Sequence, residues 1–101
     1  MKWYHYIACL FAGFFLANAI PHFVQGVSGD NFPSPFSNPP GKGPSSPTVN
    51  VLWALFNIII GYLLYKGGKV ATGKWALLVF FIGFAAAGIM LSITFTDKLS
   101  Q

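Results

Sequence analysis

The sequence predicts an all-α membrane protein with three transmembrane helices in a single domain that covers residues 1–101. Of its 101 residues, 54% are hydrophobic and only 8% are charged, whereas soluble domains carry about 25% charged residues. The apolar residues also gather in three stretches, 3–24, 49–65 and 75–95, and none of these contains Asp, Glu, Lys or Arg. Because a spanning helix needs about 17 to 25 mostly apolar residues, each stretch is long enough to cross a membrane.

The first helix is expected over residues 3–24, and its N-terminal part also resembles a secretion signal. Lys2 supplies a positive charge, residues 7–16 supply an apolar core, and Ala17-Asn18-Ala19 supplies a small-x-small cleavage pattern. The Ile20-Pro21 pair that follows is a poor context for cleavage, and apolar residues continue beyond it. We therefore expect this helix to be retained in the protein.

Pro21 leaves two possibilities for the end of the first helix. Proline lacks a backbone N–H and disfavours helical backbone at the residue before it. The helix therefore either ends near Ala19 or kinks there and continues to Gly26.

A long proline-rich outer loop is expected over residues 26–47, between the first and second helices. Six prolines lie between Pro33 and Pro47, and proline interrupts both helices and sheets. Loops of this length are usually either functional or disordered. Phe23, Phe32 and Phe36 favour partial order, since aromatic side chains prefer the membrane interface. We expect the loop to lie as a lid over the helix ends.

The second and third helices are expected over residues 47–65 and 74–96, joined by a short cytoplasmic turn at 66–74. Ser46 followed by Pro47 is a typical helix start, because serine caps the free N–H groups and proline fits the first helical position. The shortness of the turn predicts that these two helices run antiparallel.

The lysines predict the orientation of the chain in the membrane. Lys66, Lys69 and Lys74 lie in or beside the short turn, and cytoplasmic loops are enriched in positive charge. The N-terminus is therefore expected in the cytoplasm, and the proline-rich loop and the C-terminus are expected outside it.

Small residues predict where the helices approach one another, because lipid gives no hydrophobic drive between helices and close packing has to contribute. The helix-packing positions that this selects are Gly13, Ala17, Gly61, Gly83, Ala87 and Gly88. The third helix carries more small residues than one contact needs, which suggests a second subunit. Packing within a single chain is the alternative.

The polar side chains of the apolar segments and the loop form the best candidate site. A pocket on the outer side is predicted from Asn18, His22, Asp30, Asn50 and Asn57. Asn18 and Asn50 are predicted at similar depths, so their amides could meet if the first two helices are neighbours, with His22 just above them. Asn57 lies near the centre of the bilayer, where an amide needs a hydrogen-bond partner.

Each of these polar residues also has a purely structural explanation. Asn57 can hydrogen-bond to a backbone carbonyl of a neighbouring helix, His22 can cap a helix end, and Asp30 can belong to a turn. A pair between Asp30 and His22 would instead make the loop sensitive to pH.

Signatures of catalysis, metal binding and nucleic-acid binding are missing from the sequence. It has no paired carboxylates, no nucleophile with a base and no phosphate-binding glycine loop, so no catalytic residues and no enzyme activity are expected. His5 and Cys9 supply too few ligands for a metal site, and His5 and His22 are expected at opposite membrane faces, which excludes haem between them. The six lysines form no basic stripe for nucleic acid. No metal or cofactor is predicted.

Several short motifs around the loop resemble those of small bacterial membrane proteins of unassigned function. They are Asn18-Ala19-Ile20-Pro21-His22-Phe23-Val24, Gly26-Val27-Ser28-Gly29, Phe32-Pro33-Ser34-Pro35-Phe36, Pro39-Pro40-Gly41 and Ser45-Ser46-Pro47, followed by Asn50 and Trp53. The resemblance covers the loop and both adjoining helix ends. It implies a multi-pass protein of the bacterial inner membrane and implies no activity.

Two functions fit these observations. The first is a non-catalytic membrane component that forms homo-oligomers or binds another membrane protein, which the surplus of small residues favours. The alternative is the binding or transport of a lipid-like or small neutral molecule in an outer-leaflet pocket under the loop. The absence of charged residues from the three apolar stretches argues against an ion pathway, because such pathways are normally marked by them.

Overall fold

The computed structural model of the protein, described here for residues 1–98, contains three long helices and two short ones. They are α1 (Trp3–Val27), α2 (Pro47–Gly67), the 3-10 helix η1 (Val70–Thr72), α3 (Lys74–Thr94) and the 3-10 helix η2 (Phe95–Asp97). All three α-helices are long and apolar enough to cross a membrane. The prediction of an all-helical fold with three helices of spanning length is thereby confirmed.

The helix α1 is longer than the sequence suggested, because Pro21 lies inside it and the helix runs on to Val27. The expected end near residue 24 and the expected loop start at residue 26 therefore both move towards the C-terminus. The end of α1 is stabilised by Ser28, whose hydroxyl donates to the carbonyl of Val24 at 2.7 Å. Gly29 then turns the chain with a φ of 78°, a left-handed conformation that glycine adopts readily.

The helix α2 begins at Pro47, where its sequence indicates, but it ends at Gly67 rather than near residue 65, and α3 ends at Thr94 rather than near residue 96. The Ser46 hydroxyl accepts a hydrogen bond from the backbone N–H of Val49 at 3.2 Å, and Pro47 occupies the first helical position. Beyond Gly67, a short turn with η1 leads directly into α3. We call the end of the molecule that carries this turn, residues 68–73, the turn end, and the opposite end, which carries residues 28–46, the loop end.

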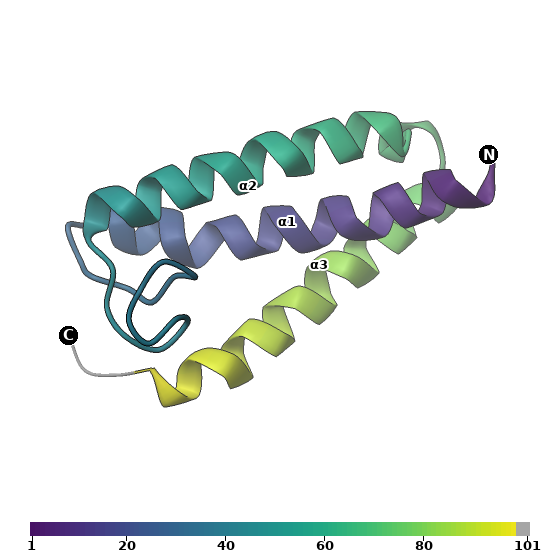
Figure 1. The fold of residues 1–101 in the computed structure, drawn as a ribbon. Helices are drawn as coiled ribbons and strands as arrows, with labels where there is room; N and C mark the ends of the chain where they lie inside the picture. Colours follow the sequence, from purple (N-terminus) through teal and green to yellow (C-terminus); the bar gives the residue numbers. More distant parts are fainter. Residues whose placement is uncertain (99–101) are drawn as a thin grey trace.

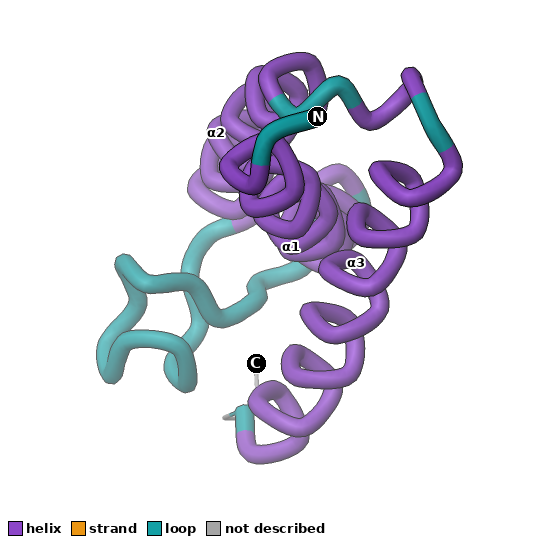
Figure 2. Tube along the Cα trace, turned by 90° about the vertical axis from the view of Figure 1, so that its right-hand side faces the viewer, coloured by secondary structure: helices purple, strands orange, loops and turns teal. Residues whose placement is uncertain are grey.

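The first helix is the centre of the arrangement. Helices α2 and α3 both pack against α1 and scarcely touch each other. Figure 1 shows α3 leaving the turn end close to the other helices and diverging from α2 towards the loop end. In the perpendicular view, the loop lies beside the last turns of α3 (Figure 2). The molecule therefore has two seams, one between α1 and α2 and one between α1 and α3.

Glycines bring α1 and α3 into backbone contact. A Cβ atom at Gly83 would overlap the carbonyl oxygen of Leu10, and one at Gly13 would overlap the carbonyl oxygen of Phe80. Because these obstacles are backbone atoms, no side-chain rotation relieves them. Ala87 is fully buried farther along α3.

The α1–α2 seam is also closely packed, and its contacts include side chains. A Cβ atom at Gly61 would lie 2.7 Å from side-chain carbons of Leu16, and one at Gly26 would lie 2.6 Å from a methyl group of Val51. At the turn end, the thiol of Cys9 donates to the carbonyl of Gly68 at 3.0 Å.

The proline-rich loop is folded back on itself. The backbone groups of Phe32 and Ser45 exchange two hydrogen bonds, of 3.1 and 3.0 Å, as an isolated antiparallel bridge. Inside the loop, the carbonyl of Ser34 accepts from the backbone N–H of Gly41 at 2.9 Å and from the hydroxyl of Ser37 at 2.7 Å. The loop therefore has its own hydrogen-bond network, and its two ends are held together beside α2.

Candidate functional site

The polar side chains of α1 and α2 form two bridges across the seam between these helices. Asn18 Nδ2 donates to Asn57 Oδ1 at 3.0 Å, and His22 Nδ1 lies 2.7 Å from Asn50 Oδ1. The sequence suggested instead that Asn18 would meet Asn50. The structure brings four of the five predicted pocket residues to this seam but joins them in different pairs.

The length of α1 explains the different pairing. Since α1 continues to Val27, Asn18 lies about 14 Å from the loop end of its helix at 1.5 Å per residue. Asn57 lies about 15 Å from the start of α2 by the same measure, so these two amides are at the same depth. Asn50 is only about 5 Å from the start of α2 and therefore lies opposite His22.

Asn57 is fully buried and uses both ends of its amide. Its Nδ2 donates to the carbonyl of Trp53 in its own helix at 2.8 Å, while its Oδ1 accepts from Asn18. The expected bond to a carbonyl of a neighbouring helix is therefore replaced by a bond within α2 and an amide–amide bridge. Such bridges help to hold helices together where water is scarce.

Asn50 fixes the direction of its hydrogen bond to His22. Its Nδ2 donates to the carbonyls of Phe32 at 2.8 Å and Ser46 at 3.1 Å, with the carbonyl of Ser45 at 3.3 Å. Because carbonyls only accept, the amide NH₂ must face them and Oδ1 must face the histidine. His22 Nδ1 is therefore the donor. In the neutral imidazole, Nε2 then carries the lone pair and acts as an acceptor.

His22 is enclosed by aromatic rings from three parts of the chain. The ring centroids of Phe32, Phe95 and Trp53 lie 5.4, 5.9 and 6.4 Å from that of His22, each at a steep angle. Only 2% of the residue is exposed. Within residues 1–98 no carboxylate bonds to the ring, and a buried charge without a partner is costly. These surroundings favour the neutral imidazole.

A cavity of about 320 Å³ lies beside this histidine. Its lining combines Asn18 and His22 of α1, Trp53 of α2 and loop residues between Ser34 and Gly41. Thr94 and Phe95, where α3 ends and η2 begins, complete it. His22 Nε2 forms no hydrogen bond within residues 1–98. His22 thus lines the cavity and has one ring nitrogen, Nε2, that can still accept a hydrogen bond.

Trp53 supplies an unused donor at the same place. Its indole N–H is the one buried side-chain nitrogen or oxygen within residues 1–98 that has no hydrogen-bond partner. Buried tryptophans usually find a partner for this group. Among the aromatic rings around Trp53, that of Phe36 has the nearest centroid, 5.4 Å from the centroid of the indole and at 84° to it. A ring face is at best a weak acceptor.

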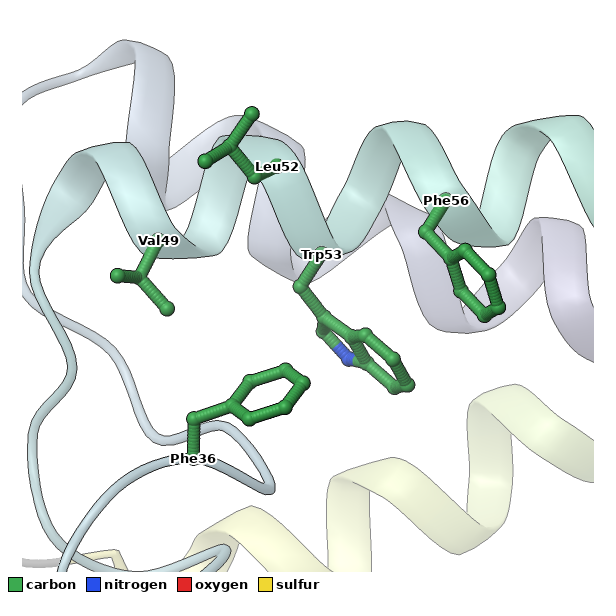
Figure 3. Close-up of a pocket in the computed structure, with 5 residues that line it drawn as sticks. All are labelled: Phe36, Val49, Leu52, Trp53 and Phe56. Carbon is green, nitrogen blue, oxygen red and sulfur yellow. The ribbon is translucent and has the colours of Figure 1, made fainter.

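Trp53 and Phe36 also border an apolar groove on the side of α2. The groove has a volume of about 370 Å³ and is lined by Phe36, Val49, Leu52, Trp53 and Phe56. Figure 3 shows the indole nitrogen of Trp53 on the side of the ring that faces Phe36 and the loop. Trp53 thus stands between the apolar groove and the cavity that contains His22.

Asp30, the fifth predicted pocket residue, lies away from the others. It is exposed and borders a separate hollow that also includes Gln25, Phe32 and Lys98. In the described part of the chain Asp30 and His22 share no hydrogen bond, since they border different hollows and His22 Nδ1 is directed at Asn50. The backbone N–H of Asp30 bonds to Gln25, which makes Asp30 part of the turn after α1.

The predicted packing residues also differ in their surroundings. Gly13, Ala17, Gly61, Gly83 and Ala87 are buried, whereas Gly88 is exposed. A Cβ atom at Gly88 would meet nothing within 4 Å in the described chain. Gly88 instead borders a groove of about 310 Å³ between α1 and α3, together with Ala17 and Pro21.

No group of three or more His, Cys, Asp or Glu side chains is arranged to hold a metal ion within residues 1–98. His5 lies near the turn end of α1, where its Nδ1 accepts from the backbone N–H of Lys2 at 3.0 Å. The two histidines therefore occupy opposite ends of the same helix.

Sequence reasoning selected His22 but not the residues that complete its surroundings. Trp53 was named only among the motif residues around the loop. Phe95 carried no signal, because its role follows from the direction in which α3 diverges. An indication was available for Trp53, since a polar N–H in an apolar stretch needs a partner.

The chain matches no protein-family model, no curated protein and no solved structure. The chemistry of the cavity is therefore inferred from its geometry alone.

Proposed function

We propose that this protein is an integral membrane protein that binds a small amphipathic molecule in the cavity beside His22, without catalysing a reaction on it. The location that we propose is a bacterial inner membrane, which the resemblance of the loop motifs implies. The molecule is 44 Å long, close to the roughly 40–45 Å of a bilayer with its headgroups. Lys66, Lys69 and Lys74 at the turn end support a cytoplasmic turn and an external loop.

The observation that carries this proposal is that two residues lining one cavity have unused polar groups in the described chain: the indole N–H of Trp53 has no partner, and His22 Nε2 has no hydrogen bond. The surrounding polar groups are otherwise well paired: Asn18, Asn50 and Asn57 all have partners. A buried donor without a partner costs about 1–3 kcal/mol. A donor and an acceptor left unused at one cavity are what a bound polar group would satisfy.

The position of the groove supports a ligand that comes from the membrane. Val49 and Phe56 lie about 3 and 14 Å from the start of α2 along the helix axis. In the proposed orientation, this range covers the headgroup region and the upper part of the outer leaflet. The groove is almost entirely apolar, whereas the cavity behind Trp53 offers polar groups. An amphipathic molecule matches both.

A second candidate function is the binding of another copy of the chain or of another membrane protein. The exposed Gly88 and its groove between α1 and α3 favour it, because small residues allow helices to approach closely. The two candidate functions use different surfaces and can be tested in one experiment.

Native mass spectrometry of the full chain, released gently from its own membrane, tests the proposal. We expect a protein that carries one lipid-sized adduct. Thr94→Trp, which places a large side chain at the cavity, should lose the adduct. Thr96→Trp is the matched control, since Thr96 is exposed and does not line the cavity. An adduct-free monomer would overturn the proposal, and a discrete adduct-free oligomer would favour the second candidate.

A further inference from the structure

We infer that the ligand is an alcohol with an apolar chain, whose hydroxyl donates a hydrogen bond to His22 Nε2 and accepts one from the indole N–H of Trp53. This inference rests on the proposed function and names the chemical class that the site selects. It follows from the direction of each hydrogen bond around His22.

The first step is the lone pair on His22. Asn50 has its NH₂ group committed to backbone carbonyls, so its oxygen takes the Nδ1 proton of His22. The remaining ring nitrogen accepts. A ligand group at Nε2 must therefore donate. Ethers, esters and ketones have no proton to donate, and a carboxylate presents only lone pairs to this nitrogen.

The second step is the indole N–H of Trp53, which requires an acceptor. An ammonium group donates to Nε2 but has no lone pair for the indole. It would also bring a positive charge into a cavity whose described lining contains no carboxylate. A hydroxyl group is both donor and acceptor, so one oxygen satisfies both nitrogens.

The spacing of the two rings is suitable for a shared oxygen. The centroids of His22 and Trp53 lie 6.4 Å apart. Two hydrogen bonds of roughly 2.8 Å each reach across at most about 5.6 Å between the two nitrogens, so a shared oxygen requires both nitrogens to lie on the facing edges of the rings. The steep angle between the rings, 80°, allows both ring edges to point at one atom.

The third step is the place of the apolar chain. Phe36 covers the indole N–H from the loop side and is 68% exposed. Its ring therefore has room to turn aside when the hydroxyl enters. The apolar groove begins at the same two residues, Trp53 and Phe36 (Figure 3). A hydroxyl at the indole thus leaves its hydrocarbon chain directly in the groove.

A water molecule has the same hydrogen-bonding pattern as a hydroxyl and is the competing occupant. Water satisfies the two nitrogens but leaves the groove to other molecules. An alcohol adds the burial of its chain, which is worth about 0.8 kcal/mol per CH₂ in transfer from water. The test therefore has to separate an alcohol from water and from an apolar chain without a hydroxyl.

The experiment uses the full chain with Trp3→Phe and Trp75→Phe, in phosphatidylcholine nanodiscs. Trp3 and Trp75 are exposed residues near the turn end, so their replacement leaves Trp53 as the only indole without touching the cavity. The ¹H–¹⁵N resonance of that indole and the ¹⁵N resonance of His22 Nε2 are followed during titration with 1-dodecanol. Dodecyl methyl ether, which accepts but cannot donate, is the matched probe.

We expect both resonances to shift with dodecanol and to reach saturation, with an apparent affinity about tenfold higher than that of the ether, as the loss of one hydrogen bond predicts. Trp53→Phe, followed through the His22 resonance, should weaken dodecanol about tenfold as well. With the ether, the ¹⁵N resonance of His22 Nε2 should shift much less than with dodecanol, because the ether oxygen cannot donate to this nitrogen and contacts only the indole.

Two other results would overturn the inference in different ways. If the alcohol and the ether bound saturably and with equal affinity, the proposed function, binding of an amphipathic molecule, would stand. The inference that the site selects a hydroxyl group would be wrong. Shifts that only follow the amount of probe in the bilayer, with a water signal persisting at the indole, would show that water is the occupant. That second result would overturn the proposed function together with the inference.

Discussion

The two seams of α1 are held by different means. Along α2, the helices are joined by side chains, with the Asn18–Asn57 and His22–Asn50 bridges at two depths. Along α3, no side-chain hydrogen bond joins the described residues, and Gly13 and Gly83 let the backbones touch. The α1–α3 seam indicates that close packing is enough to attach a helix. The α1–α2 seam, which also positions the loop and the cavity, uses directional hydrogen bonds.

The largest effect is expected where the backbones touch. Gly83→Ala should lower the free energy of unfolding by about 3 kcal/mol, the upper part of the range for overpacking, because the added carbon overlaps the backbone of Leu10. Gly88→Ala is the matched control, since its added carbon meets nothing, and alanine even favours a helix over glycine by about 1 kcal/mol. Unfolding in mixed micelles measures both. Equal losses for the two variants would contradict the backbone contact between α1 and α3.

The next effect concerns the bond that ties the loop to the α1–α2 seam. Asn50→Ala leaves the buried His22 Nδ1–H without its partner and removes one of the two hydrogen bonds to the carbonyl of Phe32, which should destabilise the protein by about 2 kcal/mol. The loop should also be cut faster by trypsin at the exposed Lys42.

The control for Asn50→Ala is Asn38→Ala, because Asn38 is an exposed loop residue. We expect its rate of cleavage at Lys42 to stay close to that of the unmodified protein. If both variants were cleaved at the same rate, Asn50 would not be the residue that holds the loop.

A smaller effect is expected from the deeper bridge. A double-mutant cycle with Asn18→Ala and Asn57→Ala should give a coupling of about 0.6 kcal/mol, typical of hydrogen bonds between membrane helices. Unfolding of the two single variants and the double variant in mixed micelles measures it. Additive losses would show that the two amides act separately and that the α1–α2 seam depends on packing alone.

The smallest effect is expected at Asp30. Asp30→Asn should change the free energy of unfolding by less than about 0.5 kcal/mol, as for most exposed positions. The ¹⁵N resonances of His22 should stay unchanged, because this histidine is bonded to Asn50. A shift of the His22 resonance would contradict this expectation and would favour the pH-sensitive pair between Asp30 and His22 that the sequence suggested.

The helices could be predicted from the sequence, but the pairs across the seam could not. Hydropathy and Ser46-Pro47 are local signals, and they indicated three long helices and the start of α2. The pairing of Asn18 with Asn57 depends on where α1 ends. That end is decided by Ser28 and Gly29, beyond a proline that equally permits an earlier stop.

The aromatic rings around His22 could not be predicted from the sequence for a different reason. Phe32 and Phe95 are far apart in sequence, yet their ring centroids lie 4.7 Å apart. This contact requires the folded loop and the divergence of α3 together. Periodicity within a single helix carries no information on either.

The central position of α1 also has a consequence for biosynthesis. This helix leaves the ribosome before α2 and α3, and at about 5–20 residues per second the last turn of α2 follows the last turn of α1 after roughly 2 to 8 s. During that interval Asn18 and His22 lack the partners that α2 later supplies. In the membrane location that we propose, insertion therefore has to shelter a helix with unpaired polar groups for some seconds. Only the arrival of its neighbour makes that helix fully compatible with lipid.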